Sequence, residues 1–97
     1  MPENLTAEKV ERYIGLTGEA LEKLKECAPE KSYAEEMARN FLEMARAYYS
    51  DAKTFYADGD LVNAFACVNY AHGWLDAGAR LGLFDTGGDD RLFTLLK

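Results

Sequence analysis

The stretch that decides the fold reads DGDLVNAFACVNYAHGWLDAGARLGL and covers residues 58–83. At its start, Gly59 suits the left-handed position that closes a helix, and the Asp60 side chain can cap the free N–H groups of a new helix. The remainder has only two charged side chains, those of Asp76 and Arg80. A helix with so little charge is mostly covered by protein. The stretch therefore predicts a tight helical hairpin followed by a largely buried helix.

Small residues form a track along this predicted helix, which covers about residues 60–84. At about 100° per residue, the track lies between two stripes of larger apolar side chains. Alanine and glycine let backbones approach closely while larger side chains fill the flanks, so the helix is predicted to sink between two others. The track consists of Ala64, Ala71, Gly78 and Gly82, and the stripes consist of Leu61, Phe65, Val68, His72, Leu75 and Ala79, and of Cys67, Tyr70, Trp74 and Leu81.

A first amphipathic helix is predicted over about residues 6–28. The Thr6 hydroxyl can cap its start, and Pro29 is expected to end it. Gly15 and Gly18 each weaken a helix by about 1 kcal/mol relative to alanine, so either a neighbour comes close there or the helix is locally soft, and we favour close packing. The predicted core face is Val10, Ile14, Thr17, Leu21, Leu24 and Ala28.

A second helix is predicted over about residues 32–57, because Ser32 and Glu35 have the spacing of a capping box. Its apolar face is wide enough to contact two neighbours, and its tyrosines, like those of the last helix, are predicted to pack in the core. This face consists of Met37, Phe41, Met44, Tyr48, Ala52 and Phe55, with Ala38, Leu42, Ala45, Tyr49 and Tyr56 beside them. The chain is thus predicted to be all-α, a three-helix up-and-down antiparallel bundle that forms a single domain over residues 1–97.

A linker and a short apolar tail follow the bundle at residues 85–97. The linker is rich in aspartate and glycine and is predicted to be flexible. The tail contains Leu92, Phe93, Leu95 and Leu96. These side chains need cover, and we expect them to fold back on the bundle rather than to dock on another chain.

The composition limits the partners of the protein. A net charge of −6 on 97 residues repels phosphate backbones, which argues against nucleic acid. The sequence has no uninterrupted apolar run of about 20 residues, so no membrane partner is expected. The first residues lack the basic and apolar regions of a secretion signal, and the protein is therefore predicted to be cytoplasmic.

The two cysteines, Cys27 and Cys67, are predicted to be free thiols that serve as small buried hydrophobes. In an up-and-down bundle, Cys27 lies at one end. Cys67 lies about 25 Å from that end, at about 1.5 Å per residue along the last helix. That separation is too long for a disulfide bond.

Three runs of residues, at 55–60, 69–78 and 80–84, resemble an archaeal family of small helical proteins catalogued as a domain of unknown function. They read FYADGD, NYAHGWLDAG and RLGLF. The resemblance covers most of the chain and is sharpest over its last forty or so residues. It implies a three-helix up-and-down bundle in an archaeal cytoplasm, and it implies no established activity.

His72 is the only histidine of the chain, so a catalytic triad or a common metal site would need an unusual set of partners. We expect no metal and no cofactor. Asp76 lies one helical turn after His72 and could orient its ring, as is seen for general bases. The simpler interpretation is a histidine that is hydrogen-bonded within a packed helix face, and a role other than catalysis is favoured.

One narrow strip of the last helix is unusually small and uncharged for a surface that faces water. We expect it to serve as an interface for self-association or for another protein. The strip consists of Val62, Ala66, Asn69, Gly73, Asp76 and Arg80. An alternative hypothesis is a small-ligand binder or enzyme with a polar pocket around Tyr70 and His72, next to Asn69 and Asp76. A third is a stabilising subunit of a larger assembly, which would use the same strip.

Overall fold

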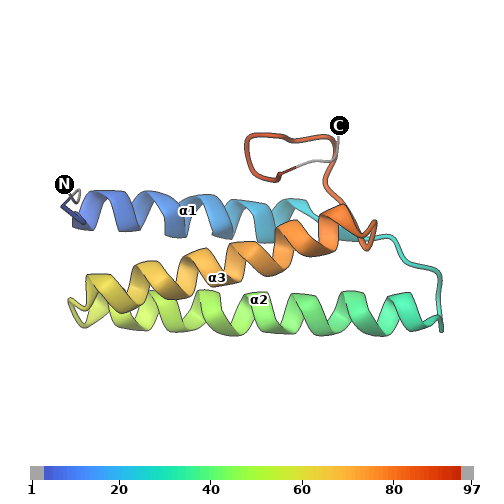
Figure 1. Cartoon of the computed structure of the whole chain (residues 1–97), viewed down its shortest axis with the longest axis horizontal. Helices are drawn as coiled ribbons and strands as arrows, with labels where there is room; N and C mark the ends of the chain where they lie inside the picture. The colour runs from blue at the N-terminus through green and yellow to red at the C-terminus, as the bar shows by residue number, and fades with distance from the viewer. Residues whose placement is uncertain (1–3, 95–97) are drawn as a thin grey trace.

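The computed structural model describes residues 4–94 and contains three helices, which confirms the predicted bundle (Figure 1). Helix α1 spans Ala7–Lys23, α2 spans Tyr33–Ala57 and α3 spans Leu61–Arg80. Figure 1 shows that α2 runs opposite to both α1 and α3. Two short strands, β1 (Lys25–Glu26) and β2 (Phe84–Asp85), pair antiparallel at one end of the bundle.

Helix α3 lies in the groove between α1 and α2 and contacts both (Figure 1). Its small-residue track faces inward, because Ala64 and Ala71 are 0% exposed and Gly78 is buried. A side chain at Gly78 would collide with the Phe84 ring, so the glycine lets the segment after α3 pack directly against the helix. Leu75, also 0% exposed, fills the centre of the core. The predicted close packing along the track is confirmed for Ala64, Ala71 and Gly78 and is wrong for Gly82, which is exposed and lies beyond the end of α3.

The hairpin between α2 and α3 is built by the capping residues that the sequence indicates. Gly59 has a φ of +80°, and the N–H of Asp60 donates to the carbonyl of Phe55 over 2.9 Å. The Asp60 carboxylate then accepts from the N–H of Asn63 over 3.1 Å and so caps α3. Together these bonds satisfy backbone groups at the end of one helix and the start of the next.

Helix α3 ends at Arg80, earlier than the predicted residue 84. Gly82, with a φ of +77°, reverses the chain after the last turn. The N–H of Leu83 donates to the carbonyl of Gly78 over 2.9 Å, and the N–H of Gly82 donates to Ala79 over 3.1 Å. This is a Schellman closure, and it releases the following residues to form β2.

Helix α1 also ends early, at Lys23, so the prediction that it continues to about residue 28 is wrong. The next residue, Leu24, is already extended, with a ψ of 153°. The chain leaves the helix because β1 pairs with β2 and the N–H of Cys27 donates to the carbonyl of Leu83 over 3.1 Å. Ala28 consequently lies outside the helix whose core face it was predicted to share.

The segment after β2 folds back over α1 and α3. Leu92 and Phe93 are 1% and 2% exposed, which confirms the predicted return of the tail for these two residues. The segment predicted as a flexible linker makes specific bonds: the Asp89 carboxylate accepts from the N–H of Leu92 over 3.1 Å and from Lys23 over 2.9 Å. Leu95 and Leu96 lie outside the described residues.

The Asp89 contacts make the attachment of this segment dependent on pH. The hydrogen bond from Lys23, helped by the backbone N–H groups of Leu92 and Arg91, lowers the pKa of Asp89 below its ordinary value of 3.8. Because the pKa is lower in the folded state, the stabilisation is complete well above 3.8 and is lost as the pH falls through the lowered pKa. We expect the hydrogen-exchange protection factors at Leu92 and Phe93, which are corrected for the slower intrinsic exchange in acid, to fall on acidification below about pH 4.

The matched variant Asp89→Asn keeps an acceptor oxygen but has no charge to lose. Its protection factors at Leu92 and Phe93 should already be lower at neutral pH and should change less on acidification. An equal acid response in both chains would show that another group controls the attachment.

Both cysteines are free thiols, as predicted, but only one of them is sheltered. Cys27 is exposed, and its Sγ donates to the Gly82 carbonyl over 3.3 Å. Cys67 is half-buried in α3, and burial raises the pKa of its thiol, with a contribution from the nearby Asp51 and Asp60 carboxylates. The prediction that both are buried is therefore wrong for Cys27, since α1 ends before reaching it.

Candidate functional site

The predicted interface residues lie along the side of α3 that faces away from the bundle. Val62 is 71% exposed, and the other members are exposed except for Asp76, which is half-buried. Asp76 accepts from the backbone N–H of Thr94 over 2.9 Å. We call this set the outer strip: Val62, Ala66, Asn69, Gly73, Asp76 and Arg80.

Gly73 is exposed in the middle of α3, and a Cβ atom built on it would meet nothing within 4 Å. A glycine at such a position weakens a helix by about 1 kcal/mol without any contact in this chain that requires it. Gly18 and Gly78 differ, because a side chain there would collide with Tyr49 or Phe84. Gly15, in α1, resembles Gly73 in having open space around it. The predicted close approach thus holds at Gly18 and is wrong at Gly15.

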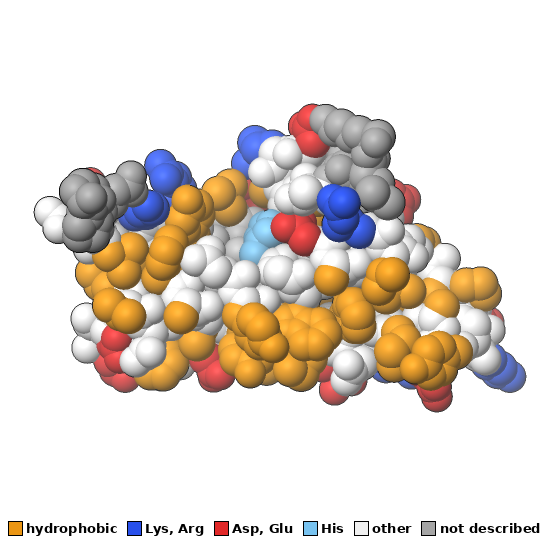
Figure 2. Space-filling model, in the orientation of Figure 1, with side chains coloured by type: hydrophobic (Ala, Val, Ile, Leu, Met, Phe, Trp, Pro, Cys, Tyr) orange, Lys and Arg blue, Asp and Glu red, His pale blue; other side chains and the backbone are white. Residues whose placement is uncertain are grey.

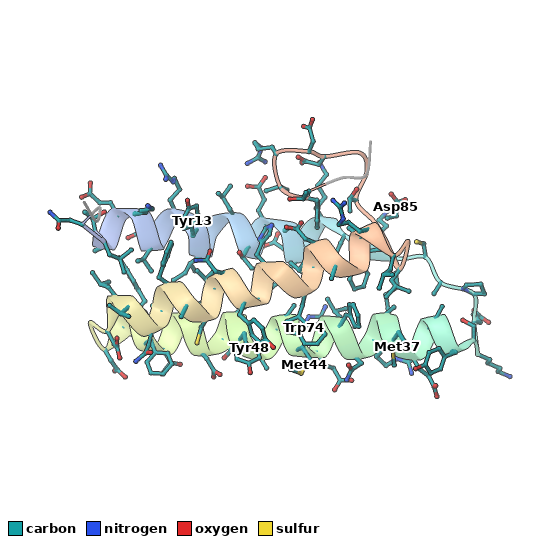
Figure 3. The ribbon with its side chains drawn as sticks, in the orientation of Figure 1. Tyr13, Met37, Met44, Tyr48, Trp74 and Asp85 are labelled. Atoms are coloured by element: carbon teal, nitrogen blue, oxygen red, sulfur yellow. The ribbon has the colours of Figure 1, made fainter. Side chains whose placement is uncertain are left out.

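A row of aromatic rings borders the outer strip on the side of α2. Tyr48 meets Tyr70 edge-to-face at 4.6 Å between ring centroids, Tyr70 meets Trp74 at 6.0 Å, and Trp74 meets Phe41 at 5.0 Å. Figure 3 shows Tyr48 and Trp74 between the two helices, and Figure 2 shows hydrophobic side chains gathered along this edge. Tyr70 is 51% exposed and Leu81 is 66% exposed, so the predicted burial of this stripe is wrong for both.

A small hollow of about 180 Å³ opens between the outer strip and the aromatic row. Its lining residues are spaced i, i+3, i+4 and i+7 along α3, which is the spacing of four neighbours on one helix face. They are Tyr70, Gly73, Trp74 and Ala77. The absent side chain of Gly73 keeps the hollow open. We call the outer strip together with this hollow and Leu81 the outer face of α3.

A second, larger groove of about 340 Å³ lies on the other flank of the outer strip, between α3 and α1. Figure 2 shows the histidine, in pale blue, inside this depression. Gly73 lines this groove as well as the smaller hollow. The groove is lined by Tyr13, Leu16, Thr17, Asn69, His72, Gly73, Asp76 and Arg91.

Both ring nitrogens of His72 are hydrogen-bonded within the chain. Nε2 lies 2.6 Å from the carbonyl oxygen of Leu92, and Nδ1 lies 2.9 Å from the hydroxyl of Thr17. A carbonyl oxygen can only accept, so Nε2 donates its proton to Leu92. In the neutral ring, Nδ1 then accepts from Thr17. The ring therefore ties the C-terminal segment to α1 and α3, and neither nitrogen is left to take a proton from a substrate.

Asp76 was predicted to orient the ring of His72, but other groups hold that ring. Its Oδ1 lies 3.9 Å from His72 Nε2, beyond hydrogen-bond length, while Leu92 occupies that nitrogen. The carboxylate is instead bonded to Thr94, through the backbone N–H and through the hydroxyl over 3.3 Å. Asp76 is thus a second attachment point for the C-terminal segment.

The predicted polar pocket is only partly assembled. Asn69, His72 and Asp76 line one groove, but Tyr70 lies on the other side of α3, in the aromatic row. Sequence reasoning missed the contributions of Thr17 and Arg91. A threonine within the apolar stripe of α1 was a usable signal for a buried polar contact. Arg91, which is paired with Glu19, was not foreseeable because the fold of the C-terminal loop brings it there.

Residues 4–94 contain neither a cluster of metal-ligating side chains nor a membrane-spanning helix. No group of three or more His, Cys, Asp or Glu side chains in this part of the chain is arranged to hold a metal ion. None of its helices combines the length and apolar character needed to cross a bilayer.

The model of one protein family, described as "Protein of unknown function (DUF357)", matches residues 12–84. The chain belongs to this family. The matched residues of the DUF357 domain include all of α2 and α3 and most of α1. No curated protein and no solved structure matches the chain significantly.

The two candidate surfaces share Asn69, Gly73 and Asp76 but differ in how far the DUF357 domain contains them. Every residue of the outer face of α3 lies within the match. The groove around His72 depends in addition on the segment after residue 84, since Leu92 and Thr94 bond its polar side chains and Arg91 forms part of its wall. In this chain the outer face therefore lies wholly within the DUF357 domain, whereas the groove is completed by residues outside it.

Proposed function

We propose that the protein is a protein–protein interaction module that binds through the outer face of α3. The observation that carries this proposal is the combination of exposed apolar side chains with an open, glycine-containing helix surface. Val62, Leu81 and Tyr70 are between 51% and 71% exposed, and a Cβ atom built on Gly73 would meet nothing within 4 Å. Aromatic residues without surrounding charge are typical of the centre of an interface, and an exposed glycine permits a partner backbone to come close.

The charges near this face favour the same function. Along α3, the only ionised side chains are Asp76 and Arg80, and Asp76 is turned toward Thr94. A partner would therefore desolvate few charges, and the burial of unpaired charge is strongly unfavourable at an interface. A subunit role in a larger assembly requires the same surface and differs only in the partner.

A charged side chain at position 73 tests the proposal. Gly73→Lys has room to form without distorting the chain, but it places a long cation in the middle of the outer face. We expect it to abolish association with the protein partner while helicity, measured by circular dichroism, stays unchanged or rises slightly because lysine is the better helix former.

Gly15→Lys is the matched control, because Gly15 is also an exposed helical glycine with open space around it. This variant should bind as the wild type does. If Gly73→Lys binds as well as Gly15→Lys, the outer face is not the interface.

The alternative, a small-ligand binder or enzyme around His72 and Asp76, has the groove of about 340 Å³ in its favour. It has less support, because His72 and Asp76 are both engaged by the C-terminal segment. An archaeal origin and a cytoplasmic location stay predictions from the sequence.

A further inference from the structure

The hollow on the outer face has the form of an empty knob-into-hole site. In paired helices, each knob side chain inserts into a hole made by four residues of the facing helix. Tyr70, Gly73, Trp74 and Ala77 form such a hole, and its volume of about 180 Å³ has room for one aliphatic side chain. What the hole lacks is a knob from a second helix.

The same face carries a suitable knob. Leu81 is 66% exposed and lies four residues after Ala77, next to the hole on α3. When two identical helices cross antiparallel about a two-fold axis, a residue four positions after the crossing point faces the residue four positions before it on the other copy. With the crossing point at Ala77, each Leu81 faces the partner copy's Gly73, which lies within the hole.

We propose that the partner of the outer face is a second copy of this chain, with α3 packed antiparallel on α3 about an axis at Ala77 and Leu81 of each copy in the hole of the other. This inference rests on the proposed function and names its partner. Ala77 is exposed and small, and Gly73 has no side chain, so the two backbones can approach at the crossing point.

The charges on the strip are complementary in this arrangement. Arg80 lies three positions after the crossing point and Asp76 lies one position before it. In the antiparallel pair, the other copy's Asp76 lies at the level of the residue one position after the crossing point. Each Arg80 is therefore separated from it by two residues along the helix axis, or about 3 Å. Within residues 4–94, Arg80 has no ion pair of its own. At the rim of an otherwise uncharged contact, each Arg80 is thereby placed near the half-buried Asp76 carboxylate of the other copy, which keeps its bonds to Thr94.

The net charge of the chain opposes the pairing and makes its strength depend on salt concentration. Each copy carries a net charge of −6, so two copies repel one another through solvent. Added salt screens this repulsion, and self-association is expected to strengthen between low and moderate salt. A basic protein partner would show the reverse, because salt weakens attraction between opposite charges. The contact spans few helical turns and belongs to the smaller, weaker class of interfaces.

Analytical ultracentrifugation of the full chain tests the inference. The wild type is expected to reach twice its mass of 10.9 kDa as concentration rises. Leu81→Asp should weaken the dimer by about tenfold or more, since it places a charge in an apolar hole. Tyr33→Asp is the control, because Tyr33 is a similarly exposed apolar residue, 74%, at the start of α2 and away from the outer face. It should dimerise as the wild type does.

A cross-link tests the position of the axis. In a chain that carries Cys27→Ser and Cys67→Ala, the substitution Ala77→Cys should give a disulfide-linked dimer under mild oxidation. The substitution Ala47→Cys, at an exposed alanine of α2, should not. Circular dichroism of each variant confirms that it is folded before it is compared.

A wild-type chain that stays monomeric at all concentrations and shows no Ala77→Cys cross-link would overturn the inference. So would a dimer that Leu81→Asp leaves intact. If the chain is monomeric but Gly73→Lys still loses a partner that Gly15→Lys retains, the outer face binds a different protein. In that case the proposed function stands and only the second-copy inference falls.

Discussion

Replacing Leu75 with alanine is expected to lower the free energy of unfolding by about 2–5 kcal/mol. Leu75 is 0% exposed and lies in the core cluster contributed by all three helices, so its loss leaves a cavity that surrounding side chains only partly fill. Urea or guanidinium unfolding followed by circular dichroism measures the change.

Val62→Ala provides the comparison on the same helix. Val62 is 71% exposed, and its truncation should change the free energy of unfolding by about 0.5 kcal/mol or less. Equal effects of the two substitutions would mean that α3 does not insert into the bundle with Leu75 inward.

Alanine at the two glycines of α3 is expected to change stability in opposite directions. At Gly78, the new Cβ would collide with the buried ring of Phe84, and the strain should cost about 1–3 kcal/mol even after the gain in helix propensity. At Gly73, nothing lies within 4 Å of the new Cβ, so only the propensity gain of about 1 kcal/mol remains.

Chemical unfolding of both variants at low protein concentration, where association is absent, measures these two values. Gly73→Ala should be more stable than the wild type and Gly78→Ala less stable. Stabilisation by both substitutions would contradict the close contact between α3 and Phe84, and destabilisation by both would contradict an open outer face.

The central part of the fold was predictable because its signals are local. Gly59 and Asp60 act on the helices directly beside them, and the track through Ala64, Ala71 and Gly78 follows the 3.6-residue period of a helix. These features depend on neighbours in the sequence. The hairpin, the register of α3 and the outward position of the outer strip could therefore be derived from the residues alone.

The parts that differ from expectation depend on contacts distant in sequence. Helix α1 ends at Lys23 because the following residues pair with β2, about sixty residues further on, and no residue near Leu24 signals this. The C-terminal segment is held in place by the hydrogen bond from Lys23 to Asp89 and by the hydrogen bond from His72 to the carbonyl of Leu92. Such pairings follow from the assembled fold and have no local motif.

In the candidate site, too, the features with a local sequence signal were predicted and those that depend on distant contacts were not. The outer strip was found from its spacing, because six small or polar residues share one helix face. The exposure of Tyr70 and Leu81 was missed, since both lie at the edge of that face, where burial depends on how far α2 extends beside α3. The hollow between them needs the positions of the neighbouring side chains. It is not visible in a list of residues.

Nuclear magnetic resonance spectra recorded over a dilution series test whether the outer face of α3 is the interface, because they show which backbone amides sense association. We expect concentration-dependent shifts at Tyr70, Gly73, Ala77 and Leu81, with Gly15 on α1 unchanged. Shifts centred on Gly15, or an outer face whose signals stay constant at every concentration while the chain associates, would contradict this interface.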